Sequence, residues 1–102
     1  MNELSTFKGR YEPGESIKLH LTHQTTADHL EWSLFHLGKE IQQGTKPVSG
    51  YDFCFFLPPL QEGGYGVEIT LYTKDHPLER LQTAVNVGGG VVRYGFLSDF
   101  LP

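Results

Sequence analysis

The sequence predicts an all-β protein, built as a sandwich of about seven short antiparallel strands. Two observations lead to this prediction. Apolar residues recur with a period of two rather than the 3.6 of a helix, and clusters of glycine and proline separate the alternating segments at regular intervals. The 102 residues are enough for one domain with a single core.

The first strand is predicted over residues 16–23, where three aliphatic side chains alternate with lysine, histidine and threonine. Just before it, Pro13 and Gly14 stand where a type II turn needs a fixed φ and then a positive φ. The chain is therefore expected to turn tightly and then to enter a strand with one buried face.

A hairpin is predicted next. In residues 29–36, Trp32 and two leucines lie on one face and mostly polar residues on the other. Gly38 then separates this segment from residues 39–43, as in a tight two-residue turn.

The break at residues 44–50 leads into residues 51–57, Tyr-Asp-Phe-Cys-Phe-Phe-Leu. This segment is apolar on both faces. Such a pattern is typical either of a strand covered on both sides or of one with an exposed aromatic row, and the sequence leaves both open.

Another break, residues 57–64, precedes a strand predicted over residues 65–73. Immunoglobulin-like sandwiches often place a tyrosine near the start of such a strand, with its hydroxyl bonded back to the preceding turn. Tyr65, two residues after Gly63, fits this tyrosine corner.

The tyrosine corner leads us to predict an immunoglobulin-like β-sandwich. Trp32 then takes the place of the buried core tryptophan, and Leu19 and Val67 replace the disulfide that many such domains contain. After a break at residues 74–79, the last strand is predicted over residues 80–87.

The bulk composition excludes several classes of partner. A net charge of −4, with eight basic residues scattered among twelve acids, disfavours nucleic acid. The sequence contains no apolar run of the length that a membrane helix needs. Cys54 is the only cysteine, so an internal disulfide is not possible.

The histidines do not form a metal motif. His20 and His23 point to opposite faces of one predicted strand, and His29 and His36 do so on another. No spacing matches a zinc site. We expect these four residues and His76 to be surface histidines, and we predict no metal and no cofactor.

No catalytic residue is predicted in the chain. Cys54 lies in an apolar segment, where a thiol usually behaves as a small hydrophobe. The glycine triplet at residues 88–90 is interpreted as a linker, because no helical pattern follows it. Four carboxylates are expected to be solvated surface groups: Asp52, Glu62, Glu68 and Asp75.

An aromatic platform for carbohydrate is an alternative reading. Tyr51, Phe53 and Phe55 share one strand parity, and Tyr72 faces outward on its own strand. A platform of Tyr51, Phe53 and Tyr72 would hold sugar rings. Placement of these phenylalanines in the core is favoured, because phenylalanine has no polar tip.

The end of the chain, Arg-Tyr-Gly-Phe-Leu-Ser-Asp-Phe at residues 93–100, resembles a junction in glycoside hydrolase family 66. This family includes dextranases and cycloisomaltooligosaccharide glucanotransferases. In it, an N-terminal immunoglobulin-like sandwich runs into a catalytic (β/α)8 barrel. Residues 9–21 are similar to the opening of the same domain.

The resemblance implies that residues 1–88 are the sandwich, and that residues 89–102 are a linker and the start of a catalytic barrel that is absent here. The barrel carries the two carboxylates that cleave or transfer α-1,6-linked glucan with retention, so this chain is not expected to be an enzyme by itself. Docking on the barrel is expected of five residues: Arg93, Tyr94, Phe96, Leu97 and Phe100.

The expected function is thus a non-catalytic accessory domain that stabilises the barrel of the same chain. A carbohydrate-binding module with its own α-glucan affinity is one alternative, and a protein-binding adhesion sandwich is another. The isolated chain is expected to be monomeric. The first ten residues lack a basic-then-apolar signal segment, which fits either a cytoplasmic protein or a secreted enzyme whose leader is missing from the sequence.

Overall fold

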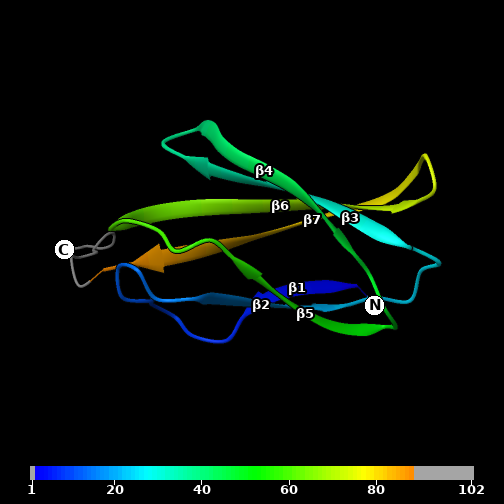
Figure 1. Ribbon diagram of the computed structural model, residues 1–102, viewed down its shortest axis with the longest axis horizontal. Helices are drawn as coiled ribbons and strands as arrows, with labels where there is room; N and C mark the ends of the chain where they lie inside the picture. Colours follow the sequence, from blue (N-terminus) through cyan, green and yellow to red (C-terminus); the bar gives the residue numbers. More distant parts are fainter. Residues whose placement is uncertain (1, 89–102) are drawn as a thin grey trace.

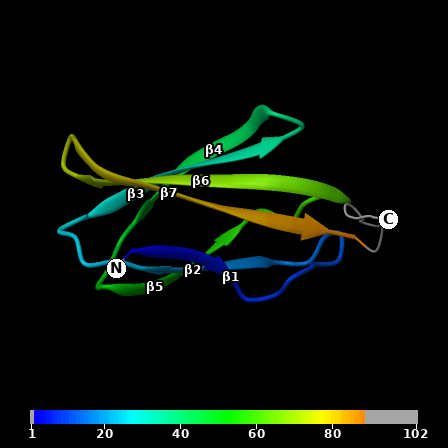
Figure 2. The ribbon, with the colours of Figure 1, turned by 180° about the vertical axis from the view of Figure 1, so that it is seen from behind.

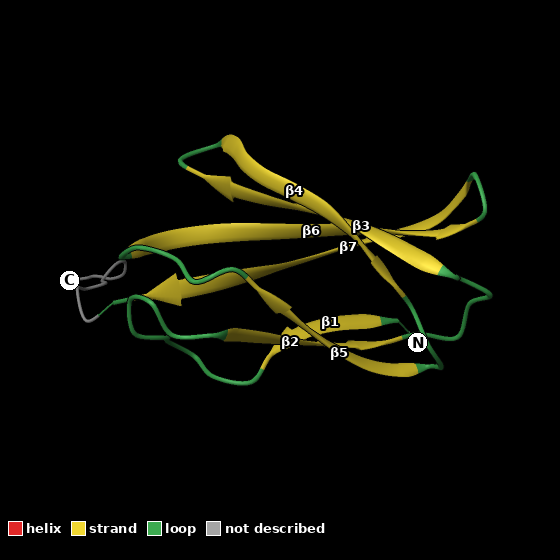
Figure 3. Ribbon diagram, in the orientation of Figure 1, coloured by secondary structure: helices red, strands yellow, loops and turns green. Residues whose placement is uncertain are grey.

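The structure is a computed structural model that describes residues 2–88 (Figures 1 and 3). These residues form seven strands and no helix, and thus no helix that could span a membrane. The strands are β1 (Glu3–Thr6), β2 (Ile17–Thr22), β3 (His29–His36), β4 (Lys39–Pro47), β5 (Asp52–Leu57), β6 (Gly63–Thr73) and β7 (His76–Val87).

The strands form two antiparallel sheets that pack face to face, as Figure 2 shows from behind. One sheet has the order β1-β2-β5 and the other the order β4-β3-β6-β7. The predicted all-β sandwich of seven strands is confirmed. In constant-type immunoglobulin domains four strands form the first sheet and three the second. Here the fourth strand stays beside β3 instead, so the division is three and four.

The strands β4 and β7 are longer than predicted, and both lie at the edges of the four-stranded sheet. β4 continues to Pro47, because a proline is tolerated on an edge strand whose outer side needs no hydrogen bond. β7 begins at His76, and a register shift between Leu71 and Tyr72 accommodates Pro77. The short strand β1 had no predicted counterpart, because its single buried apolar residue, Leu4, shows no period.

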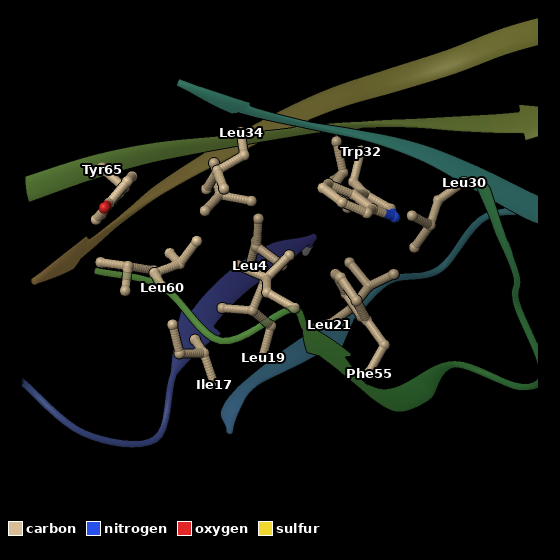
Figure 4. Close-up of a cluster of buried hydrophobic side chains, with 14 of the residues drawn as sticks. Leu4, Ile17, Leu19, Leu21, Leu30, Trp32, Leu34, Phe55, Leu60 and Tyr65 are labelled. Atoms are coloured by element: carbon tan, nitrogen blue, oxygen red, sulfur yellow. The ribbon is translucent and has the colours of Figure 1, made fainter. Parts of the chain in front are cut away.

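The core lies between the two sheets and uses alternate residues of each strand (Figure 4). Leu19 and Leu21 of β2 face Trp32 and Leu34 of β3 across the interior. Trp32 is 7% exposed, which confirms its predicted place in the core. Gly44 of β4 lies against the Trp32 ring, so closely that a Cβ there would be 2.8 Å from the indole nitrogen.

The predicted tight turns are present. Gly14 has a φ of 82°, and the Glu15 amide donates to the Glu12 carbonyl at 3.0 Å, which closes the turn before β2. Leu37 and Gly38 both have positive φ, 52° and 79°, as the central residues of a type I′ hairpin require.

The tyrosine corner is confirmed as well. Tyr65 is buried, and its hydroxyl donates a hydrogen bond to the Gln61 carbonyl at 2.8 Å. The His36 ring stacks on Tyr65 with 4.8 Å between ring centroids. The loop between β5 and β6 is therefore held against the start of β6.

Replacing Tyr65 with phenylalanine is expected to lower the free energy of unfolding by about 1 kcal/mol, because the Gln61 carbonyl loses its partner. Urea unfolding followed by Trp32 fluorescence measures this change. Tyr51→Phe, at a side chain that is 65% exposed, is the control and should change little. An equal urea midpoint for Tyr65→Phe and the parent would contradict the role of the corner.

Candidate functional site

The sandwich has two loop ends, and β7 finishes at one of them (Figure 1). That end also holds the loop before β2, the β3–β4 turn and the β5–β6 loop. We call it the exit end, because the last described residues, Val87 and Gly88, lie there. The opposite end holds the β2–β3, β4–β5 and β6–β7 connections.

Tyr11 joins the exit end to both sheets. Its backbone pairs in parallel with Val87, its amide donates to the Asn86 carbonyl at 2.8 Å, and its carbonyl accepts from the Gly88 amide at 2.7 Å. Its side chain is 2% exposed. The hydroxyl donates to the Lys18 carbonyl at 3.2 Å and accepts from the Phe7 amide at 3.3 Å. One residue thus fixes where the chain leaves β7 relative to β2.

The loop around Tyr11 is rigidified by polar contacts. The Gly14 amide donates to the Leu60 carbonyl at 3.1 Å, which ties this loop to the β5–β6 loop. Glu15 accepts from the Glu12 amide and pairs with Lys8. The Glu12 hydrogen bond first, and Lys8 second, lower the pKa of the Glu15 carboxyl.

The outer face of the sheet β1-β2-β5 is partly apolar beside the exit end. Phe7 and Phe56 are 54% and 51% exposed. Lys18 lies between them: its Cα partner on β5 is Phe56, and its ammonium lies 4.7 Å from the Phe7 ring centroid. His20 and the exposed Cys54 are paired next along the same face. We call these five residues the Phe7–Phe56 face.

The structure corrects the expectation for one residue of β5 and for one residue just after β2. Cys54 is exposed and does not pack as a small hydrophobe, because the inward residues of β5 are Phe53, Phe55 and Leu57. His23 is 1% exposed and is not a surface histidine. His20, His29 and His36 are half-buried and His76 is exposed. Residues 2–88 contain no group of three or more side chains placed to bind a metal.

The aromatic residues of the alternative carbohydrate platform do not lie together on one face. Phe53 packs against the core, and Phe55, which stacks on it, is buried. Tyr51 is exposed beside β5, whereas Tyr72 lies on β6 of the other sheet. Tyr72 stacks instead on His29 with 5.2 Å between ring centroids.

A hollow of about 350 Å³ lies on the outer face of the four-stranded sheet. Phe35 supplies one aromatic ring, and Gly66 lies beside it: a Cβ at Gly66 would be 3.8 Å from the Phe35 Cβ. Glu68 accepts a hydrogen bond from the Gln82 amide nitrogen at 2.9 Å at the edge of the hollow. An aromatic ring next to hydrogen-bonding side chains can contact both the C–H groups and the hydroxyls of a sugar.

At the opposite end, Asp28 links the start of β3 to the β6–β7 turn. It pairs with the His29 ring and accepts from the Lys74 amide at 2.8 Å. The His29 hydrogen bond first, and the Lys74 amide second, lower the pKa of the Asp28 carboxyl. Burial first, and the Glu31 charge second, raise the pKa of Tyr72 on the adjacent strand.

A carboxyl whose pKa is lower in the folded state stabilises the fold above its unfolded pKa, near 4, and loses that contribution as the pH falls through its folded pKa. Asp28→Asn is therefore expected to reduce the fall in the free energy of unfolding that occurs below about pH 4. Urea midpoints at pH 6 and pH 3 measure it, with Asp75→Asn, next to Lys74 in the β6–β7 turn, as the control. A profile for Asp28→Asn as steep as that of the parent would contradict the assignment.

The five residues expected to dock on a barrel, Arg93, Tyr94, Phe96, Leu97 and Phe100, lie outside the described residues. Sequence reasoning missed Tyr11, Phe7 and Phe56. The period of the segments could not reveal Phe56, because both parities of β5 are apolar.

A family model described as "Glycosyl hydrolase family 66" matches residues 6–102. No curated protein matches the chain. Among solved structures, a superoxide reductase (neelaredoxin) from Ignicoccus hospitalis is similar with 10% identity and a TM-score of 0.59, over 86% of this chain and 80% of that one. Fibronectin(III)-like modules of Clostridium thermocellum CbhA are similar with 15% identity and a TM-score of 0.55, over 87% and 99%. At these identities the likeness shows the fold alone.

Proposed function

This chain belongs to glycosyl hydrolase family 66, and on that premise we propose that its sandwich is a non-catalytic accessory domain of a glycoside hydrolase. The domain packs against the catalytic barrel of the same chain and stabilises it. The parent enzyme hydrolyses or transfers α-1,6-linked glucan, as dextranases and cycloisomaltooligosaccharide glucanotransferases do.

The observation that carries this proposal is the Tyr11 joint. An accessory domain can stabilise its neighbour only if the connection between them has a defined position. The two backbone hydrogen bonds between Tyr11 and residues 86 and 88 hold the last described residue against a buried side chain. The five predicted docking residues follow within a dozen positions of Gly88.

The placement of acids supports the non-catalytic role. A retaining glycosidase needs two carboxyl groups about 5 Å apart on either side of the bond. Of the four acids considered above, Asp52 and Glu68 lie on different sheets. Glu62 is at the exit end and Asp75 is at the opposite end. We therefore place the catalytic pair in the barrel.

The test compares the complete enzyme with a variant that lacks residues 1–88. The expected result is a lower thermal midpoint of glucan cleavage and a catalytic rate that is retained at low temperature, because the barrel loses its neighbour but not its carboxylates. An unchanged midpoint would overturn the proposal.

Glucan binding by the sandwich itself is a second candidate, and the hollow beside Phe35 is the observation that favours it. Affinity electrophoresis of the chain in a dextran gel tests it. Retardation that is lost in Phe35→Ala and kept in Tyr51→Ala would support this function. Equal mobility with and without dextran would exclude it.

A further inference from the structure

We propose that the Phe7–Phe56 face is the surface of the sandwich that the catalytic domain of the same chain covers. This inference rests on the proposed function and specifies where the two domains meet. It follows from the exposure of the face, from its connection to the exit end and from its charge.

The face carries two phenylalanines where a solvated sheet should be polar. Strands with one buried face normally turn polar side chains outward, and β2 does so with Lys18, His20 and Thr22. Phe7 and Phe56 lie on either side of Lys18, and each is more than half exposed. Neighbouring apolar side chains left in water on one sheet face commonly mark an interface.

The occupant is argued from the path of the chain. Tyr11 holds Gly88 through its backbone, and its hydroxyl bonds directly to the backbone of Phe7 and of Lys18. The chain therefore leaves β7 beside Tyr11, whose hydroxyl contacts the backbone of the Phe7–Phe56 face. A domain that follows Gly88 is present at a high effective concentration beside this face, so a small interface suffices to hold it.

The charge around the face indicates the chemistry of its counterpart. Lys18 lies within the face, and Arg10 is exposed in the loop that leads to Tyr11. Neither makes a salt bridge among residues 2–88. We therefore infer a counterpart that presents apolar side chains together with carboxylates. Covering the face would also desolvate the Lys18–Phe7 pair, which strengthens a cation–π contact.

Cys54 provides a probe that does not depend on stability. It is the only cysteine of the chain, it is exposed, and it lies on this face two residues from Phe56. In the complete enzyme, alkylation of Cys54 by iodoacetamide, followed by mass spectrometry of its peptide, should be slower than in the 102-residue chain by about tenfold or more, because a covered thiol reacts only when the interface opens.

Two double variants test whether the phenylalanines of the face are responsible for this protection. Phe7→Ser with Phe56→Ser in the complete enzyme should restore the alkylation rate of Cys54 to that of the 102-residue chain. Ile41→Ser with Leu78→Ser removes two apolar side chains of similar exposure, 48% and 42%, from the other sheet and should leave Cys54 protected. Glucan cleavage at low temperature should be unchanged in both double variants.

Two results would overturn the inference. One is equal alkylation of Cys54 in the complete enzyme and in the 102-residue chain. If removal of residues 1–88 still destabilises the enzyme, the accessory function then stands and only the location is wrong. The other is protection of Cys54 in the 102-residue chain that rises with protein concentration, since a second copy of the chain would then occupy the face.

Discussion

Tyr11→Ala is expected to lower the free energy of unfolding by about 3–5 kcal/mol, the usual cost of truncating a buried aromatic side chain. Tyr11 is 2% exposed and belongs to the hydrophobic core cluster. A domain of this size has about 5–15 kcal/mol in total, so the variant should be close to unfolding at 37 °C. Urea unfolding followed by the fluorescence of Trp32, the only tryptophan, measures the change.

Tyr11→Phe separates packing from hydrogen bonding at the same site. It keeps the ring and removes only the contacts to the Lys18 carbonyl and the Phe7 amide, both longer than 3.1 Å. A loss of about 0.5–1.5 kcal/mol is expected. If Tyr11→Ala cost no more than Tyr11→Phe, the joint between β7 and the first loop would not depend on the ring.

His23→Leu is the second substitution with a large expected effect, about 2–4 kcal/mol. His23 is buried, and its Nε2 donates to the Gly50 carbonyl at 2.7 Å, while Nδ1 accepts from the Thr25 amide at 3.2 Å. This one ring connects the β2–β3 loop to the β4–β5 loop. Leucine fills much of the space but leaves the Gly50 carbonyl and the Thr25 amide without these partners.

His76→Leu is the matched control, because His76 is exposed at the start of β7. A change within about 0.5 kcal/mol is expected for it. Hydrogen exchange adds a local readout: the His23 amide, which donates to the Tyr51 carbonyl at 3.0 Å, should lose protection in His23→Leu. Equal unfolding energies for the two leucine variants would contradict the role of His23.

The sequence was sufficient for the parts of the fold that depend on local rules. Alternation of side chains identified six of the seven strands. Pro13-Gly14 and Gly38 identified two turns, and the positive φ of both glycines confirms them. The corner at Tyr65 followed from a short motif that joins a turn to a strand.

Features that depend on long-range packing could not be predicted. The hairpin turn predicted that β4 lies beside β3, but the extension of β4 to Pro47 is decided by its pairing with β3 as far as His29. The burial of His23 depends on a loop 27 residues away in sequence. The direction of Phe56 was ambiguous, because both faces of β5 are apolar and only its register with β2 selects the inner one.

The pairing of Tyr11 with Val87 has a consequence for synthesis on the ribosome. Tyr11 emerges early, but the strand that it pairs with is the last of the strands within residues 2–88 to be made. A nascent chain that ends before Val87 cannot close this contact, and the apolar inner faces of its layers remain open to chaperones and proteases. The domain therefore completes its fold only as the junction itself is translated.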